Sequence, residues 1–468
     1  MNKITRHCFD PWEYIEFRTD GRLSPCCIQP SLTKPFTNLS EYRNIQELRD
    51  LRQGLLEGNL DFKCKNCPLR EKISIDEFQQ KLKERYLDPV DQLSAPQQLV
   101  MVRIGFTERC NLRCTYCATS QPGYEGVEPD VEQVPGGREM PPDKLEKIIQ
   151  ELADYPHIDE IAVNGHGETT FYKGWSGYCN RLLDIGHKLT IICNFARQFD
   201  TEEIAAFSRF KSITISIDTD DPVLLKQIRR KVDLGNILTN MFRIRAKALA
   251  DGRKAPDFIF LSGVYDKNVT KLDELAWFAV ACDVKEISFW KLLKYPDVEQ
   301  AQNVQPIYQL DKEQFLRAFD TLKRTEEILT THGIKAVFTG GLWEDVETKY
   351  QKYISLKISA KNFSEDSCQV SVMVRPHRSN QDEKINFYAV YVKDGVISFL
   401  PAENGPVLVW DTKTDDMPSY RLITKEEQEV TVEFPINKAE PSLLTYYVGC
   451  GKTVSEVMEN ENYISFRL

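Results

Sequence analysis

The stretch that decides the fold is residues 110–117, which read Cys-Asn-Leu-Arg-Cys-Thr-Tyr-Cys. Its three cysteines, Cys110, Cys114 and Cys117, have C-x3-C-x2-C spacing. Residues 99–106 form an apolar run of strand length, so the cysteines are expected on a loop that follows a strand. Three thiolates on one short loop can hold three corners of a [4Fe–4S] cluster and leave one iron open. The alternative is a zinc knuckle or a chance cluster, but zinc sites usually pair C-x2-C with a second such pair.

Length and composition restrict the class of protein. The chain has 468 residues, 41% of them hydrophobic and 10% aromatic, which predicts two or three domains with cores of their own. A formal net charge of −10 disfavours a nucleic-acid partner. No apolar run reaches the ~18 residues of a membrane span, and the first residues do not form an apolar signal region. Thirteen cysteines without an export signal indicate the reducing cytoplasm rather than a disulfide framework.

The C-x3-C-x-aromatic-C pattern after a first strand resembles the signature of the radical S-adenosylmethionine (SAM) enzymes. The resemblance implies that Cys110, Cys114 and Cys117 hold a [4Fe–4S] cluster whose open iron chelates the amino and carboxylate groups of SAM. Reductive cleavage of SAM would then give a 5′-deoxyadenosyl radical that takes a hydrogen atom from the substrate. The aromatic residue of the motif, Tyr116, is expected to pack near the adenine. An electron donor such as flavodoxin or ferredoxin is implied as a partner.

Residues 91–341 alternate strand and helix patterns about six times, which predicts a parallel sheet with right-handed crossovers. The resemblance implies a partial (β/α)6 barrel of this kind. Ligands bind at the carboxyl ends of such strands, and polar residues follow several of the predicted strands. By resemblance, one group fixes the methionine amine of SAM: Gly165, Gly167 and Glu168. A second group is expected to orient the ribose and the carboxylate: Asn194, Ser216, Asp218 and Arg229, or Arg230 in place of Arg229.

Residues 1–90 carry a second set of cysteines. The Asp20-Gly21 pair between two short alternating runs predicts a β-hairpin. Such a hairpin would bring Cys8 to the same end as the Cys26-Cys27 pair. A C-x2-C follows a predicted helix, and the complete set is Cys8, Cys26, Cys27, Cys64 and Cys67. Thiolate-only sites suit zinc and iron–sulfur about equally. The pattern is similar to the SPASM-type module of radical SAM enzymes, which implies one auxiliary [4Fe–4S] cluster with Cys26 preferred over Cys27.

Residues 342–468 contain several β-like runs and predict a small β-rich α+β domain of unknown role. A Gly- and Pro-rich stretch, 121–140, is expected to be a lid or substrate loop. Cys193, at the end of a barrel strand, is a tentative hydrogen-atom donor; the alternative is a small buried hydrophobic residue.

The expected substrate is a ribosomally made peptide, modified by epimerisation or oxidative crosslinking. The alternatives are a sugar or aminocyclitol as substrate and, in another class, a non-catalytic iron–sulfur or zinc scaffold.

Overall fold

We describe the fold from a computed structural model of the chain. The description covers residues 3–33, 36–67, 69–86, 93, 100–117, 139–155, 158–292, 304–364, 367–376, 385–393, 396–399, 408–409, 419–422, 428–435, 445–451, 457, 460 and 462–466. The chain divides into two compact units, Met1–Ile307 with Asp320–Leu342 and Tyr308–Phe319 with Trp343–Leu468. No helix in the described ranges is both long enough and apolar enough to cross a membrane.

The first unit is built on one nine-stranded sheet with the order β11-β10-β9-β8-β7-β6-β5-β2-β3. Neighbouring strands from β2 to β11 are parallel, and β3 pairs antiparallel with β2. The strands are β2 (Tyr14–Phe17), β3 (Leu23–Ser24), β5 (Met101–Ile104), β6 (Glu160–Ala162), β7 (Leu189–Cys193), β8 (Ser212–Ser216), β9 (Asp257–Val264), β10 (Glu286–Lys291) and β11 (Lys335–Thr339). The predicted α/β class with a mostly parallel sheet is confirmed.

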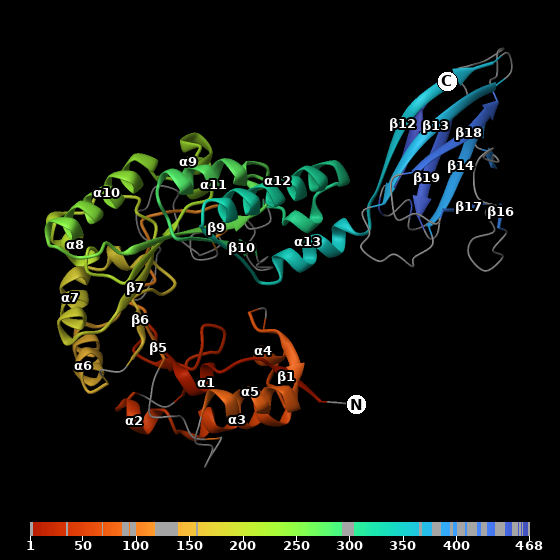
Figure 1. Cartoon of the computed structure of the whole chain (residues 1–468). Coiled ribbons are helices and arrows are strands. Elements are labelled where there is room, and N and C mark those ends of the chain that lie inside the picture. The colour runs from red at the N-terminus through yellow and green to blue at the C-terminus, as the bar shows by residue number, and fades with distance from the viewer. Residues whose placement is uncertain are drawn as a thin grey trace, which may run out of the picture. The chain divides into compact units, whose positions relative to one another are not determined.

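Helices connect successive parallel strands and cover the outer side of the sheet (Figure 1). They are α6 (Pro142–Ala153), α7 (Trp175–Ile185), α8 (Thr201–Phe207), α9 (Pro222–Arg229), α10 (Leu234–Ala250), α11 (Leu272–Ala281) and α12 (Lys312–Thr331), with the short 3-10 turns η2 (Thr169–Phe171), η3 (Val269–Lys271) and η5 (Ile307–Gln309). Helix α6 shows why they form, because its apolar residues Leu145, Ile148, Ile149 and Leu152 recur at helical spacing and are all buried.

The two faces of the sheet differ in chemistry. Alternate residues of a strand point to opposite faces, and the register aligns Ile191 with Ile213 and Ile213 with Phe258 on the helix-covered face. These three side chains are at most 1% exposed. The other face of the same strands carries Thr190 and Thr214, which are only half-buried. The inner face is therefore the one that can meet a ligand.

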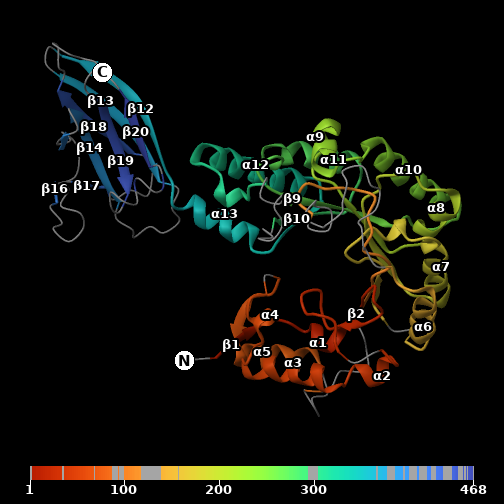
Figure 2. The same ribbon diagram turned by 180° about the vertical axis from the view of Figure 1, so that it is seen from behind.

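The N-terminal segment adds a small helical layer beside β1 (Figure 2). Its elements are β1 (Ile4–Arg6), α1 (Asp10–Glu13), α2 (Leu39–Tyr42), α3 (Gln46–Glu57), α4 (Phe62–Lys65), β4 (Lys72–Ser74) and α5 (Ile75–Arg85). Trp12, Leu55, Phe78 and Leu82 form its core. The predicted hairpin is present as β2–β3, but β2 also pairs in parallel with β5. The expected boundary near residue 90 therefore does not separate two sheets, because the hairpin extends the barrel sheet.

The second unit is mostly β-sheet. A three-stranded sheet contains β12 (Ile354–Phe363), β13 (Ser367–Pro376) and β18 (Gln428–Pro435). A six-stranded sheet contains β14 (Ile385–Lys393), β15 (Val396–Phe399), β16 (Leu408–Val409), β17 (Ser419–Leu422), β19 (Thr445–Gly451) and β20 (Tyr463–Phe466). Helix α13 (Leu342–Tyr350) precedes β12. The unit also takes in residues 308–319, with the first turns of α12, which the predicted boundary at 341 placed with the barrel.

Candidate active site

The cysteine loop follows β5, where the sequence predicted it. Two hydrogen bonds within the loop hold its conformation. The amide of Leu112 donates to Sγ of Cys110 at 3.4 Å, and the amide of Cys117 donates to the carbonyl of Cys114 at 3.3 Å. The amide of Thr115 donates to the carbonyl of Ile228 in α9 at 2.9 Å. The loop is thus fixed to the helix that follows β8, three strands after β5 along the chain.

The three thiols of this loop are close enough to affect one another. Burial raises the pKa of Cys110, and negative charge on Glu168, Cys114 and Cys117 raises it further. Burial also raises the pKa of Cys114 to about 12, against the opposing effect of the Arg229 guanidinium. Thiols of this kind hold their protons until a metal displaces them, so loading a cluster releases protons.

The glycine loop after β6 packs directly on the cysteine loop. The amide of Gly167 donates to the carbonyl of Thr107 at 3.1 Å, and the amide of Glu168 donates to the carbonyl of Arg109 at 2.8 Å. A Cβ atom on Gly167 would lie 2.6 Å from the carbonyl oxygen of Thr107, and a Cβ atom on Gly165 would lie 3.0 Å from Cα of Gly105. Both glycines are needed because two backbones meet here, and their role toward SAM stays a prediction.

Glu168 joins this loop to the end of β7. Glu168 is only 4% exposed. Its Oε1 atom accepts hydrogen bonds from the backbone amide and the hydroxyl of Thr170, and its Oε2 atom accepts one from the backbone amide of Asn194 at 2.9 Å. Asn194 in turn donates from Nδ2 to Oδ1 of Asn111 at 2.8 Å, inside the cysteine loop. The ends of β5, β6 and β7 therefore meet at one point, as expected for the carboxyl edge of a parallel sheet.

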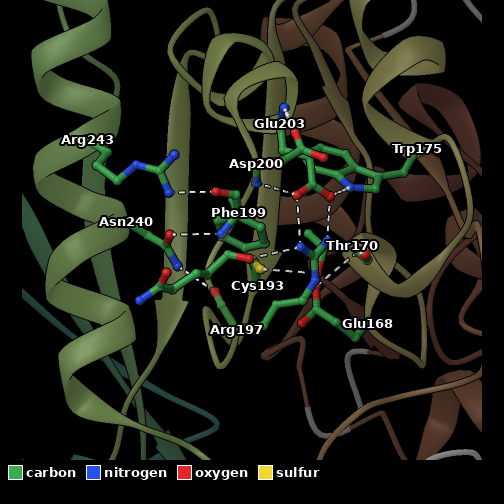
Figure 3. Close-up of polar contacts among 11 residues, drawn as sticks. Glu168, Thr170, Trp175, Cys193, Arg197, Phe199, Asp200, Glu203, Asn240 and Arg243 are labelled. Atoms are coloured by element: carbon green, nitrogen blue, oxygen red, sulfur yellow. Dashed lines mark hydrogen bonds and ion pairs between the residues drawn. The ribbon is translucent and has the colours of Figure 1, made fainter.

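A second set of polar residues, which the sequence did not single out, holds the end of β7 (Figure 3). Arg197 donates from Nη1 to Oε2 of Glu203 at 2.8 Å and from Nη2 to the carbonyl of Thr170 at 2.9 Å. Nε1 of Trp175 donates to Oε1 of Glu203 at 2.8 Å. Phe195, between Asn194 and this network, has φ 50°, a backbone conformation that is rare for a residue with a side chain. The Asp200–Glu203 capping box was the sequence signal that could have located this network of Arg197, Glu203 and Trp175.

Cys193 lies on the other face of the sheet from the expected ligand. It pairs with Ile215 and shares the helix-covered face with Leu189 and Ile191. The residue is 1% exposed, and its Sγ lies 3.9 Å from Oγ1 of Thr170. The burial and the helix-covered face suit the alternative of a small buried hydrophobic residue, and a role of Cys193 as hydrogen-atom donor stays a prediction.

The predicted residues after β8 form a buried cluster. Nε of Arg229 donates to Oδ2 of Asp218 at 2.7 Å, and the hydroxyl of Tyr116 donates to the same atom at 3.0 Å. Although burial favours the neutral guanidine, the carboxylate of Asp218 keeps the pKa of Arg229 well above its usual value. Ser216 ends β8 on the inner face and is half-buried. The roles of Tyr116, Ser216, Asp218 and Arg229 in binding SAM stay predictions.

The second cysteine set lines a single cavity at the N-terminal segment. Cys8, Cys26, Cys27, Cys64 and Cys67 all contribute to its wall, together with charged residues that include Arg6, Asp10 and Arg70. The β2–β3 hairpin brings Cys8, Cys26 and Cys27 together, while Cys64 lies in α4 and Cys67 follows that helix.

Cys26 and Cys27 have different surroundings. Burial raises the pKa of Cys26 to about 11, and the pKa values of both Cys8 and Cys64 are affected by charge on Cys26. Gln29 donates its backbone amide to Sγ of Cys26 at 3.4 Å and its side-chain amide to Sγ of Cys64 at 3.2 Å. The charges that act on Cys27 include Arg103, on the inner face of β5. Both cysteines line the cavity, and the choice of Cys26 over Cys27 as the ligand stays a prediction.

Comparison with known families identifies the class of this domain. Residues 104–269 match the family model described as the Radical SAM superfamily, a range that starts in β5 and includes Cys110, Cys114 and Cys117. Residues 104–269 of the chain therefore form a radical SAM domain, the domain of a class of enzymes. Members of the superfamily use a [4Fe–4S] cluster together with SAM.

Among individual proteins, the chain is similar to two GTP 3′,8-cyclases. It is 24% identical over 225 residues to that of Aquifex aeolicus, a match that covers 46% of this chain and 66% of the relative. It is 23% identical over 178 residues to that of Streptomyces coelicolor, covering 38% of this chain and 48% of the relative. The matches thus span less than two thirds of these relatives. Among solved structures, SuiB of Streptococcus suis bound to its precursor peptide SuiA aligns at 14% identity and TM-score 0.39, over 78% of this chain and 76% of that chain.

Proposed function

We propose that this chain binds SAM beside a [4Fe–4S] cluster on the cysteine loop, cleaves it reductively and abstracts a hydrogen atom from a substrate carbon. The observation that supports the proposal most directly is the meeting of Cys110, Cys114 and Cys117 with Glu168 at the carboxyl edge of the parallel sheet, inside a radical SAM domain. The loop of residues 110–117 supplies three thiolate ligands, which suits a cluster that keeps one iron open.

The residues of this chain fit that pair of cofactors. Cys110, Cys114 and Cys117 would hold the cluster, and the loop of Gly165, Gly167 and Glu168 would face the SAM amine. When bound, SAM supplies the primary carbon radical that abstracts hydrogen. Such a species needs a site from which water is excluded. Burial of Asn194 and Glu168, 6% and 4% exposed, supports a dry edge at the ends of β6 and β7.

The test is the Cys114→Ala variant, with Cys179→Ala as its matched control. Both thiols are buried, but Cys179 lies on helix α7, away from the cysteine loop. We expect Cys114→Ala to form no 5′-deoxyadenosine after anaerobic reconstitution and reduction by a low-potential donor such as flavodoxin or ferredoxin, and Cys179→Ala to retain activity. Product formation by Cys114→Ala at the parent rate would refute the proposal.

We also infer that the N-terminal cavity holds an auxiliary [4Fe–4S] cluster on Cys8, Cys26, Cys64 and Cys67. The four cysteines line one cavity, and Gln29 donates to the sulfurs of Cys26 and Cys64. Four thiolates suit zinc and iron–sulfur about equally. The similarity of the cysteine pattern to SPASM-type modules favours the cluster.

The proposed substrate is a ribosomally made peptide, modified by epimerisation or by oxidative crosslinking. Support comes from the similarity of the N-terminal cysteine pattern to SPASM-type modules, and the β-rich second unit offers a further surface for a macromolecule. A cytoplasmic location fits thirteen cysteines that form no disulfide. The experiment is turnover in deuterated solvent: deuterium in the product carbon supports epimerisation, and net loss of two hydrogens supports oxidation. Turnover of a sugar or aminocyclitol, with no peptide accepted, would refute the peptide assignment.

A further inference from the structure

The charged pair at the end of β8 is almost completely removed from solvent. Asp218 is 0% exposed and Arg229 is 7% exposed. The carboxylate of Asp218 is already well supplied with donors, because it accepts from Arg229, from the hydroxyl of Tyr116 and from the amide of Gly263 at 3.0 Å. A buried charge pair is costly to desolvate and is often no more stabilising than apolar residues. Stability alone therefore does not account for this buried pair.

Both partners of the pair contact the cysteine loop. The Arg229 guanidinium uses Nε and Nη2 on Asp218 and directs Nη1 toward Sγ of Cys114 at 4.0 Å. The same guanidinium lies 5.6 Å from the ring centroid of Tyr116. The amide of Thr115 donates to the carbonyl of Ile228, one residue before Arg229. Three consecutive residues of the cysteine loop therefore rest on one turn of α9.

The backbone beyond this turn is strained. Arg230 and Lys231, neither of them glycine, have φ values of 23° and 65°. Non-glycine residues in this region are uncommon and persist only where the surrounding structure fixes them. The side chain of Arg229 and the carbonyl of Ile228, both engaged by the groups above, supply that fixation.

We propose that Arg229 is a positioning residue for the cysteine loop, and that its fixed positive charge beside the Cys114 sulfur raises the reduction potential of the cluster held there. Asp218 and Tyr116 set the position of the guanidinium. Reduction adds one electron from an external donor to the cluster, and a nearby positive charge stabilises the more negative reduced form. Hydrogen bonds to the sulfurs and net local charge are the means by which a protein sets this potential. The inference rests on the proposed function, because it requires a cluster on this loop.

The experiment compares Arg229→Gln and Arg229→Lys with the parent in a redox titration followed by electron paramagnetic resonance, without SAM. Arg245→Gln is the control, because Arg245 is a half-buried arginine of the same unit whose guanidinium donates to the carbonyls of Cys282 and Asp283. For Arg229→Gln we expect the ratio of reduced to oxidised cluster at a fixed potential to fall about tenfold, a shift of about 59 mV. Arg229→Lys keeps the charge and is expected close to the parent, and Arg245→Gln is expected unchanged.

The outcomes separate the two proposals. If the parent forms a cluster and cleaves SAM but Arg229→Gln has an unchanged reduction potential, this inference alone is overturned. Weaker SAM binding in that variant would then make Arg229 a SAM ligand. A parent without a cluster overturns both proposals. If Arg229→Gln fails to fold because Asp218 is left unpaired, the double variant Asp218→Asn/Arg229→Gln is compared with Asp218→Asn alone. The two then differ only in the Arg229 charge, and equal potentials in them overturn the inference.

Discussion

Gly167→Ala tests the reasoning about the site most severely, because it changes one methyl group at the contact between two loops. The new Cβ would lie 2.6 Å from the carbonyl carbon of Glu108 and 2.6 Å from the carbonyl oxygen of Thr107, and closer still to the carbonyl oxygen of Arg109. All three are backbone atoms, so no side chain can rotate away. The glycine loop and the cysteine loop must therefore move apart.

The cost follows from that displacement. Overpacking of this kind costs roughly 1–3 kcal/mol. Separating the loops also weakens the bonds from Gly167 to Thr107 and from Glu168 to Arg109, each worth about 1 kcal/mol. We expect a loss of about 2–5 kcal/mol in the free energy of unfolding of the first unit. A shift of about 1 Å at the site also costs on the order of 100-fold in the rate of SAM cleavage.

Gly177→Ala provides the matched control for this measurement. Gly177 lies in α7, and a Cβ at that position would meet nothing within 4 Å. Alanine there is expected to raise stability by up to about 1 kcal/mol, because glycine is the weaker helix former. Urea unfolding of the metal-free proteins and 5′-deoxyadenosine formation by the reconstituted proteins give both readouts. A Gly167→Ala protein as stable and as active as Gly177→Ala would refute the close contact between the two loops.

Three further predictions test other parts of the structure. Cys193→Ala is expected to lower stability by about 1 kcal/mol by removing buried apolar volume and to leave the stereochemistry of the product unchanged; loss of hydrogen return to the substrate would contradict its placement on the helix-covered face. Burial opposes ionisation of Glu203, but the guanidinium of Arg197 outweighs it and lowers the pKa of this carboxyl overall. The ion pair therefore stabilises the fold fully at pH values above the ordinary glutamate pKa. This contribution is lost as the pH falls through the lowered pKa. The stability difference between parent and Glu203→Gln, measured by urea unfolding, is therefore expected to be constant near neutrality and to shrink in acid; a difference that grows in acid would contradict the sign. Cys27→Ala is expected to keep the iron content of the parent while Cys64→Ala loses about one cluster's iron, and equal losses would make Cys27 a ligand.

Much of the architecture followed from local signals. The Asp20-Gly21 turn and the alternating residues around it predicted the β2–β3 hairpin, which is present. Residues 189–192 and 212–217 are rich in β-branched residues, and β7 and β8 coincide with these stretches nearly to the residue. Such features are readable because turn chemistry and strand periodicity act over a few residues. The parallel pairing of β2 with β5 was not foreseen, since it joins segments more than 80 residues apart by backbone bonds that leave no mark on the side-chain pattern.

The sequence by itself determined the cysteine spacing and the alternation of strand and helix, and these were enough to define the class of domain. The tertiary structure decided on which face of the sheet each side chain lies and which groups it contacts. It buried Cys193 beside Thr170, paired Asp218 with Arg229, and made Gly167 the contact point of two loops. The physical reason is that spacing along the chain fixes local geometry, whereas burial and pairing depend on strand register and on residues that are distant in sequence.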